Sequence, residues 1–216
     1  MTTIVLPTKN EEESIGKTIN MIKRLCDCRI VVVDARSSDK TVEIAREKGV
    51  EVIYDHGKGK GDALITAFKY ASDDVIYVDP DMTYPLEKIP EFVEALKEGY
   101  DVVTGDRAAF GKKALPRALR FGDKISRSLF RLIYGRAVDN LSGFRGLSER
   151  AIEKMRLEEE GFGIETEISA KAVKMGLRMK NISIIYQPRL GETKFRPVTD
   201  GLIVLKTMLK YRFIRS

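Results

Sequence analysis

Short apolar runs alternate with longer amphipathic stretches along the first hundred residues. The apolar runs cover residues 3–7, 29–34, 50–54, 75–78 and 101–105. The stretches between them, at about 10–25, 38–49, 62–70 and 86–97, place apolar residues at helical spacing. Strands that alternate with helices in this way form βαβ units with right-handed crossovers. The pattern therefore predicts an α/β fold with a mostly parallel sheet covered by helices on both faces.

The pattern changes after Gly105. We expect a long basic amphipathic helix at about 116–134, a short strand within 139–147, helices near 149–156 and 164–175, and a last strand at 179–186. From about residue 199 a tail rich in Leu, Ile and Val predicts an amphipathic helix, too short to span a bilayer, that lies on a membrane surface or caps the core. This organisation predicts one domain over 1–198, with halves at 1–105 and 106–198, and a C-terminal helix at 199–216.

Composition and charge narrow the classes of function. The 216 residues include one histidine, His56, and two cysteines, Cys26 and Cys28. With a single histidine, a Ser-His-Asp triad is not expected and a multi-histidine metal site is excluded. The two cysteines are expected to be reduced thiols in a cytoplasmic protein. From 107 to 136, nine basic residues accompany one acid, a local excess of +8 in a chain of net charge +6. Such a patch predicts contact with phosphates, an anionic membrane surface or nucleic acid, although no aromatic stacking run supports nucleic acid.

Two aspartates follow the predicted strand at 75–78. Asp79 and Asp81 flank Pro80, and residues at this spacing in an extended segment point to the same side. Their carboxylate oxygens suit Mg²⁺ or Mn²⁺, whereas the plain alternative is a turn at the strand end. Nearby, the run Gly57-Lys-Gly-Lys-Gly61 precedes a predicted helix, where phosphates bind readily. Its spacing matches neither a P-loop nor a dinucleotide-binding fingerprint.

Several of these motifs fall at predicted strand ends. In parallel sheets, ligands bind beyond the carboxyl ends of the strands, so these motifs are expected to meet at one edge. We predict that Lys58, Lys60 and Arg107 hold a diphosphate next to a metal on Asp79 and Asp81. The arrangement suits transfer of the group attached to that diphosphate.

Six motifs in order resemble the family 2 glycosyltransferases of the GT-A fold. They are Leu6–Glu11, Val31–Thr41, Asp79–Asp81, Gly105–Arg107, Ser142–Arg145 and Gly161–Glu167. A seventh, Arg189-Leu-Gly-Glu-Thr-Lys194, is similar to an element of the branch that contains the dolichol-phosphate mannose synthases. The resemblance covers nearly the whole chain. It implies a GT-A fold with a nucleotide-sugar-binding half at 1–105 and an acceptor half at 106–198.

The resemblance also implies roles for single residues. With Lys58 and Lys60 from the glycine-rich run, the expected donor-binding residues are Pro7, Lys9, Glu11, Val33, Asp34, Ala35, Asp79, Pro80, Thr83, Lys194 and Arg196. The expected catalytic residues are Asp81, the expected direct metal ligand of the pair, with Arg107, Arg120 and Arg189. The residues expected near the acceptor are Arg120, Arg127, Glu165 and Glu167. The family usually has Asp at Ala35 and Tyr or His at Lys9, so both UDP and GDP remain open.

The predicted function is metal-dependent transfer of a hexose from a donor of the GDP-mannose or UDP-glucose type to a polyprenyl or dolichyl phosphate. A phosphate oxygen is already an anion near neutral pH, so this acceptor needs no strong general base. The basic patch and the last helix favour a cytoplasmic protein bound peripherally to an anionic membrane surface. The alternatives are a soluble glycosyltransferase with a small phosphorylated or hydroxyl acceptor, and a non-catalytic sugar-nucleotide-binding protein. Binding of nucleic acid is not expected.

Overall fold

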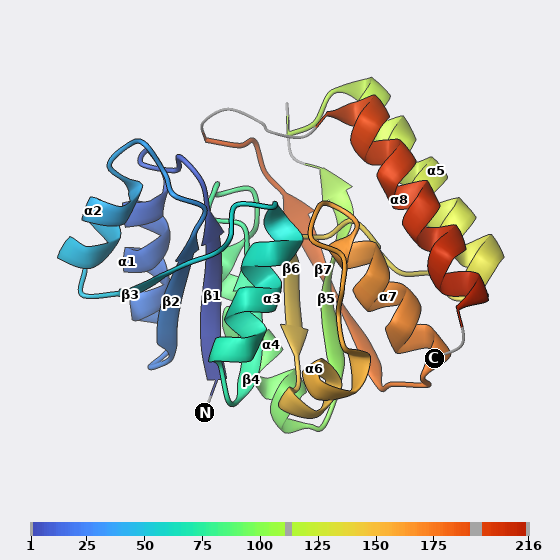
Figure 1. Cartoon of the computed structure of the whole chain (residues 1–216), viewed down its shortest axis with the longest axis horizontal. Coiled ribbons are helices and arrows are strands. Elements are labelled where there is room, and N and C mark those ends of the chain that lie inside the picture. The colour runs from blue at the N-terminus through green and yellow to red at the C-terminus, as the bar shows by residue number, and fades with distance from the viewer. Residues whose placement is uncertain (1, 111–113, 191–195, 215–216) are drawn as a thin grey trace.

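Seven strands form one sheet at the centre of the computed structural model, which describes residues 2–110, 114–190 and 196–214 (Figure 1). The strands are β1 (Thr2–Thr8), β2 (Arg29–Asp34), β3 (Glu51–Tyr54), β4 (Asp74–Val78), β5 (Val102–Phe110), β6 (Phe144–Leu147) and β7 (Met179–Tyr186). Their order across the sheet is β3-β2-β1-β4-β6-β5-β7. All neighbouring strands pair in parallel except β6, which is antiparallel to both β4 and β5. The predicted mostly parallel sheet is therefore confirmed.

Helices cover both faces of the sheet. They are α1 (Ile15–Leu25), α2 (Thr41–Glu47), α3 (Lys60–Tyr70), α4 (Ile89–Lys97), α5 (Arg117–Tyr134), α6 (Glu149–Met155), α7 (Ile164–Lys174) and α8 (Pro197–Phe213), with a short 3₁₀ turn at Leu86–Lys88. The first helix starts later than the predicted residue 10, because Asn10 has a positive φ of 50° and its side chain accepts a hydrogen bond from the backbone N–H of Ser38. In the part of the chain that the structure describes, no helix has the length and apolar character needed to cross a membrane.

Alternate residues of the central strands belong to two separate cores. In β1, Val5 packs in the core that includes Phe68 of α3 and Met208 of α8. Ile4 and Leu6 point to the opposite face, in the core formed with α1 and α4. Both faces of the strand are thus buried, which explains the continuous apolar runs that replace an apolar–polar alternation.

The carboxyl ends of β1, β2, β3 and β4 lie along the upper edge of the sheet in Figure 1. Pairing of β1 with β2 places Pro7 opposite Val33, and Thr8 opposite Asp34. The antiparallel β6 starts at this same edge, where Val78 at the end of β4 pairs with Phe144. Residues far apart in the sequence are therefore assembled at one edge.

Candidate active site

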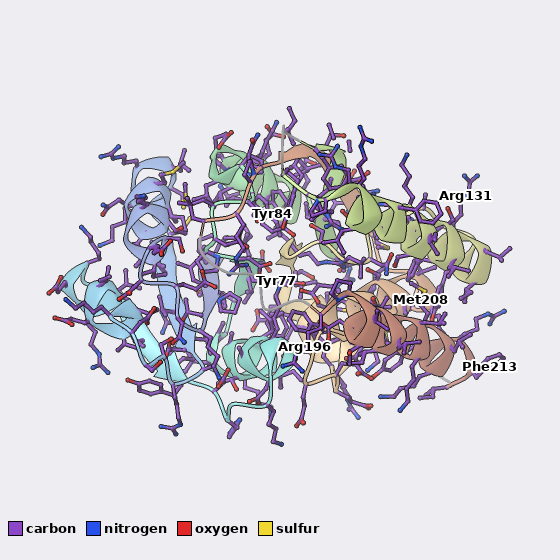
Figure 2. The ribbon with its side chains drawn as sticks, turned by 90° about the horizontal axis from the view of Figure 1, so that it is seen from above. Tyr77, Tyr84, Arg131, Arg196, Met208 and Phe213 are labelled. Atoms are coloured by element: carbon purple, nitrogen blue, oxygen red, sulfur yellow. The ribbon has the colours of Figure 1, made fainter. Side chains whose placement is uncertain are left out.

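The end of β4 and the start of β6 fix the position of Asp79. Its backbone N–H donates to the carbonyl of Gly143 (3.2 Å), and the N–H of Gly143 donates to the hydroxyl of Tyr84 (2.7 Å). A Cβ at position 143 would lie 2.2 Å from Oδ2 of Asp79 and 2.6 Å from Nζ of Lys60, so a larger residue would push these two side chains out of their places. Figure 2 looks onto this edge and shows Tyr84 near its middle. Glycine at position 143 thus leaves room for the side chains of Asp79 and Lys60.

Lys60 joins two carboxylates at the first turn of α3. Its Nζ lies 2.6 Å from Oδ1 of Asp79 and 2.7 Å from Oε1 of Glu165, which belongs to the first turn of α7. Burial opposes the charge of Lys60, but the carboxylates of Asp79 and Glu165 outweigh it and hold the pKa of Lys60 well above its ordinary value. Lys60 therefore carries a fixed positive charge beside Asp79.

Arg189 makes the matching contacts with Asp81. Its Nη1 lies 2.6 Å from Oδ2 of Asp81, and its Nη2 lies 2.5 Å from Oε1 of Glu11. Burial and the neighbouring Asp79 raise the pKa of Asp81, while Arg189 and Thr83 act in the opposite direction. Thr83 donates from both its backbone N–H and its hydroxyl to Oδ1 of Asp81. Thr83 therefore orients Asp81.

A second ion-pair cluster lies between β5 and α5. Arg107 donates from Nε to Asp139 (2.7 Å) and from Nη2 to Asp123 (2.6 Å). Arg127 pairs with the same two carboxylates at 2.6 and 2.9 Å, and also with Asp106. Arg107 and Arg127, which were expected to face the donor and acceptor phosphates, are thus paired with buried carboxylates, and their expected roles remain predictions. Together they tie α5 to β5.

Other predicted site residues lie apart from the two aspartates. Lys58 is exposed and pairs with Glu160 at 2.7 Å, so its ammonium group does not join Lys60 at the centre. Glu167 is buried, accepts from the N–H groups of residues 158 and 159, and pairs with Lys171 at 2.6 Å, which is a structural arrangement. Arg120 lies over the ring of Phe110, with 5.3 Å between its guanidinium carbon and the ring centroid.

Of the two other basic residues expected from the late loop, Arg196 is described, at the start of α8. Arg196 is exposed and precedes that helix, and its backbone N–H donates to Asp200 at 2.6 Å. Figure 2 shows Arg196 between the sheet and the body of α8. Lys194 lies outside the described residues. Arg189 is therefore the member of the predicted loop that the structure brings to Asp81.

The ends of β1, β2 and β3 form a separate polar group. Pro7, Val33 and Ala35 line the strand ends, and Lys9 is exposed just beyond them. Asp34 is fully buried, and its carboxylate accepts from the Thr8 hydroxyl (3.0 Å), the Ser37 hydroxyl (2.6 Å) and the Ser37 backbone N–H (2.8 Å). Its oxygens are therefore hydrogen-bonded within the protein, and its expected role in reading the base remains a prediction.

Asp55 is a residue that the motif analysis missed. It directly follows β3, whereas Asp34 is the last residue of β2, and it is buried, with only 3% of its surface exposed. Its Oδ1 accepts from the N–H of Gly57 (2.8 Å), while Oδ2 has no hydrogen-bond partner among the described residues. Burial raises the pKa of Asp55. An aspartate directly after a predicted strand, at the same edge as Asp34, was the available signal.

Asp79 and Asp81 have the chemistry of a divalent metal site but supply only part of a coordination shell. Among the described residues, no cluster of three or more His, Cys, Asp or Glu side chains is arranged to hold a metal. Magnesium and manganese are commonly held by one or two carboxylates with further oxygens from phosphates and water. The two aspartates, each neutralised by a neighbouring cation, fit this type of site.

Comparison with known proteins identifies the family. The family model "Glycosyl transferase family 2" matches residues 3–156. A dolichyl-phosphate hexose transferase of Haloferax volcanii is 34% identical over 211 residues, which cover 96% of this chain and 92% of that protein. A dolichol-phosphate mannosyltransferase of Pyrococcus furiosus is 33% identical over 78% of this chain and 52% of that protein.

Solved structures agree on the fold. Glucosyl-3-phosphoglycerate synthase of Mycobacterium tuberculosis, crystallised with Mn²⁺, UDP and glucosyl-3-phosphoglycerate, superposes with a TM-score of 0.78 at 24% identity. The match covers 100% of this chain and 81% of that one. The shared architecture is the predicted GT-A fold. The chain therefore belongs to glycosyl transferase family 2, and it is a glycosyltransferase.

Proposed function

We propose that this chain transfers a hexose from a nucleotide-diphosphate sugar to a polyprenyl or dolichyl phosphate. The observation that carries the acceptor class is that the carboxylates at the centre of the site are paired with cations. Asp79 and Glu165 are paired with Lys60, and Asp81 and Glu11 with Arg189. An acceptor hydroxyl would need a general base, whereas a phosphate oxygen attacks as an anion.

The donor diphosphate is proposed to bind where Asp79, Asp81, Lys60 and Arg189 meet. A divalent cation bound to both aspartates and to diphosphate oxygens would neutralise charge on the leaving group. Lys60 and Arg189 lie beside the two aspartates, so their charges would also face these oxygens. During transfer an acceptor phosphate oxygen forms a bond to the anomeric carbon, and the bond from that carbon to the diphosphate breaks. Both cations are suited to stabilise the departing diphosphate.

The nucleoside is proposed to bind at the ends of β1, β2 and β3. Lys9 lies exposed at this end, Asp34 orders the turn after β2, and Asp55 offers an unpaired carboxylate oxygen after β3. A carboxylate can accept from the ring N–H of either uracil or guanine. Asp55 is thus proposed to take the place of the second aspartate that the chain lacks at Ala35.

The cellular setting follows from this proposal. Cys26 and Cys28 are both unpaired, which suits a reducing cytoplasmic compartment. A lipid-linked acceptor would bring the protein to the cytoplasmic face of a membrane.

The second candidate is transfer to a small phosphorylated acceptor in solution. It is favoured by the fold match to a synthase that was crystallised with UDP and glucosyl-3-phosphoglycerate. Such an acceptor would meet the same cations at the edge of the sheet. The two candidates differ in the acceptor's chain, which is apolar in one and absent in the other.

Donor binding is tested by thermal denaturation with UDP- and GDP-sugars, with and without Mn²⁺. We expect one nucleotide class to raise the melting temperature only with Mn²⁺, and Asp81→Asn to abolish the metal dependence. A metal-independent rise that is equal in Asp81→Asn would contradict the proposed diphosphate site. The matched control is Asp27→Asn, since Asp27 is exposed and remote from these strand ends.

A further inference from the structure

Two neighbouring helices, α5 and α8, expose large apolar side chains. Phe121 and Leu132 of α5 are 66% and 81% exposed, and Phe213 at the end of α8 is 81% exposed. The other exposed apolar residues of these helices are Ile125, Val198, Leu202, Ile203, Leu205 and Leu209. Single exposed apolar residues are common on proteins, but a continuous apolar surface marks a site of contact.

Five of the six exposed large apolar residues of α8, all except Ile203, follow one line along the helix. They lie at positions 198, 202, 205, 209 and 213, a spacing of four, three, four and four residues. The opposite side of the helix is the one that packs: Val204, Met208 and Tyr211 are buried in the core. The helix is therefore apolar on two opposite sides. Its outward side does not pack in the core and is available to contact another apolar surface.

Cations border the apolar line of α5. Arg117, Lys124 and Arg131 recur every seven residues and are exposed, so they lie along one line beside the apolar positions 121, 125 and 132. The acids within the two helices are Asp123 and Asp200, and both are buried. Figure 2 shows Arg131 pointing outward from α5. The outer surface of the two helices thus combines apolar side chains with unneutralised positive charge.

The two helices lie side by side and lead away from the active-site edge. The Tyr134 hydroxyl of α5 donates to the carbonyl of Met208 in α8 at 2.7 Å, which fixes their relative position. Both begin at the upper edge of the sheet and end together at the lower right in Figure 1. We name their outward surface, formed by the exposed residues given above, the α5–α8 face.

We propose that the α5–α8 face docks on the surface of an anionic phospholipid bilayer. The apolar line would enter the boundary between headgroups and acyl chains, while Lys124 and Arg131 would meet the headgroup phosphates. A second copy of the chain fits less well, because a two-fold contact through this face would bring like charges together. The inference deepens the proposed function by naming the surface that brings the site to a lipid acceptor.

The test is flotation with vesicles of phosphatidylcholine alone or mixed with phosphatidylglycerol, using the full chain without any sugar donor. Wild-type protein is expected to float with the anionic vesicles and much less with the neutral ones. The double variant Phe121→Ser/Phe213→Ser is expected to lose at least about tenfold in affinity. The variant Lys124→Gln/Arg131→Gln is expected to lose about fivefold for each cation removed.

The matched control is Ile185→Ser, because Ile185 is an exposed apolar residue on β7, outside the face. It should bind vesicles like wild type, and all variants should keep the wild-type melting temperature. Binding that is unchanged in Phe121→Ser/Phe213→Ser would overturn the proposal. The proposal would also be overturned if sedimentation showed that the wild-type protein is a dimer without lipid and that the variant Phe121→Ser/Phe213→Ser is a monomer. The flotation assay contains no donor, so its result does not depend on catalysis. A protein that floats here but transfers no sugar in a separate activity assay would contradict the proposed function and leave the docking proposal intact.

Discussion

Arg189 neutralises Asp81 in the position where a metal ion would act. Its guanidinium bridges Asp81 and Glu11 at 2.6 and 2.5 Å, so a cation that binds Asp81 must displace it. The backbone near Arg189 is itself held to this loop, since the N–H of Leu190 donates to the carbonyl of Asp81 (3.0 Å). At the scale of residues, release of Arg189 toward the diphosphate would couple binding of the metal to binding of the donor.

Arg189→Gln tests this competition without catalysis. We expect the nucleotide-free variant to bind Mn²⁺ roughly fivefold more tightly, because a partly exposed ion pair no longer has to be broken. The same variant should bind the nucleotide diphosphate more weakly, because it lacks a cation for the diphosphate. Calorimetric titration measures both affinities. Lys180→Gln, which removes an exposed ion pair with Glu98, is the control; unchanged or weaker Mn²⁺ binding by Arg189→Gln would refute the competition.

Single residues also show how far a sequence can predict a site. Asp79, Asp81, Lys60 and Arg189 were all predicted and meet at one edge, because strand ends in a parallel sheet share a position that the sequence reveals. The partners of Arg107 could not be predicted. Asp139 lies 32 residues further along the chain, and no local pattern links the two. The sequence count of +8 between residues 107 and 136 includes Arg107 and Arg127 as cations that could bind a phosphate. In the fold, both arginines are paired with carboxylates.

At the scale of elements, two glycines allow close contacts of different kinds. A Cβ at position 143 would meet the side-chain ends of Asp79 and Lys60, which can move. A Cβ at position 61, in the first turn of α3, would lie 1.8 Å from the carbonyl oxygen of Glu159, which is backbone. One contact therefore belongs to the site, and the other joins α3 to the loop before α7.

Gly143→Ala and Gly61→Ala should separate these effects. We expect Gly143→Ala to keep a melting temperature close to wild type but to lose at least tenfold in affinity for Mn²⁺ and donor. Gly61→Ala should lower the free energy of unfolding by about 1–3 kcal/mol, because the backbone has to shift. Denaturant unfolding and calorimetry measure the two quantities. Equal stability loss in both variants would show that position 143 is structural alone.

The arrangement of elements was predicted in part. The boundaries of β2 and β7 match the predicted strands at 29–34 and 179–186. β2 is a continuous apolar run that is buried on both faces, whereas β7 lies at the edge of the sheet and mixes buried and exposed residues. The antiparallel direction of β6 could not be predicted, because a run of four residues does not show which strands it pairs with or in which direction. The length of β5 was also missed: its last residues, 106–110, are partly exposed and pair with β7 at the edge of the sheet.

At the scale of the whole molecule, the cluster around Asp139 joins β5, α5 and the segment before β6. Burial alone would raise the pKa of Asp139, but the charges and hydrogen bonds of Arg107, with the charge of Arg127, lower it to about 2, below its ordinary value of 3.8. That difference corresponds to roughly 2 kcal/mol. Because the folded-state pKa is lowered, this contribution is present above pH 3.8 and is lost as the pH falls through 2.

Asp139→Asn should therefore destabilise the protein at pH 7 by roughly 3–5 kcal/mol, since it leaves the buried Arg107 and the half-buried Arg127 short of a partner. The difference in unfolding free energy between wild type and variant should narrow as the pH falls from 4 toward 2. Urea unfolding at several pH values measures it. The control is Asp27→Asn, which replaces an exposed carboxylate and should change the unfolding free energy little. If the loss of unfolding free energy in Asp139→Asn does not vary with pH, the proposed stabilisation by the ionised Asp139 is wrong.

The central claim, transfer to a lipid-linked phosphate, is tested most directly by one product assay. Purified protein is incubated with Mn²⁺ and radiolabelled GDP-mannose or UDP-glucose, with dolichyl phosphate and 3-phosphoglycerate offered in parallel reactions. We expect label to enter the organic phase as a dolichyl-phosphate sugar, and Asp81→Asn to abolish this product. Label that appears only in a water-soluble phosphoglycerate product, or in neither product with either donor, would contradict it.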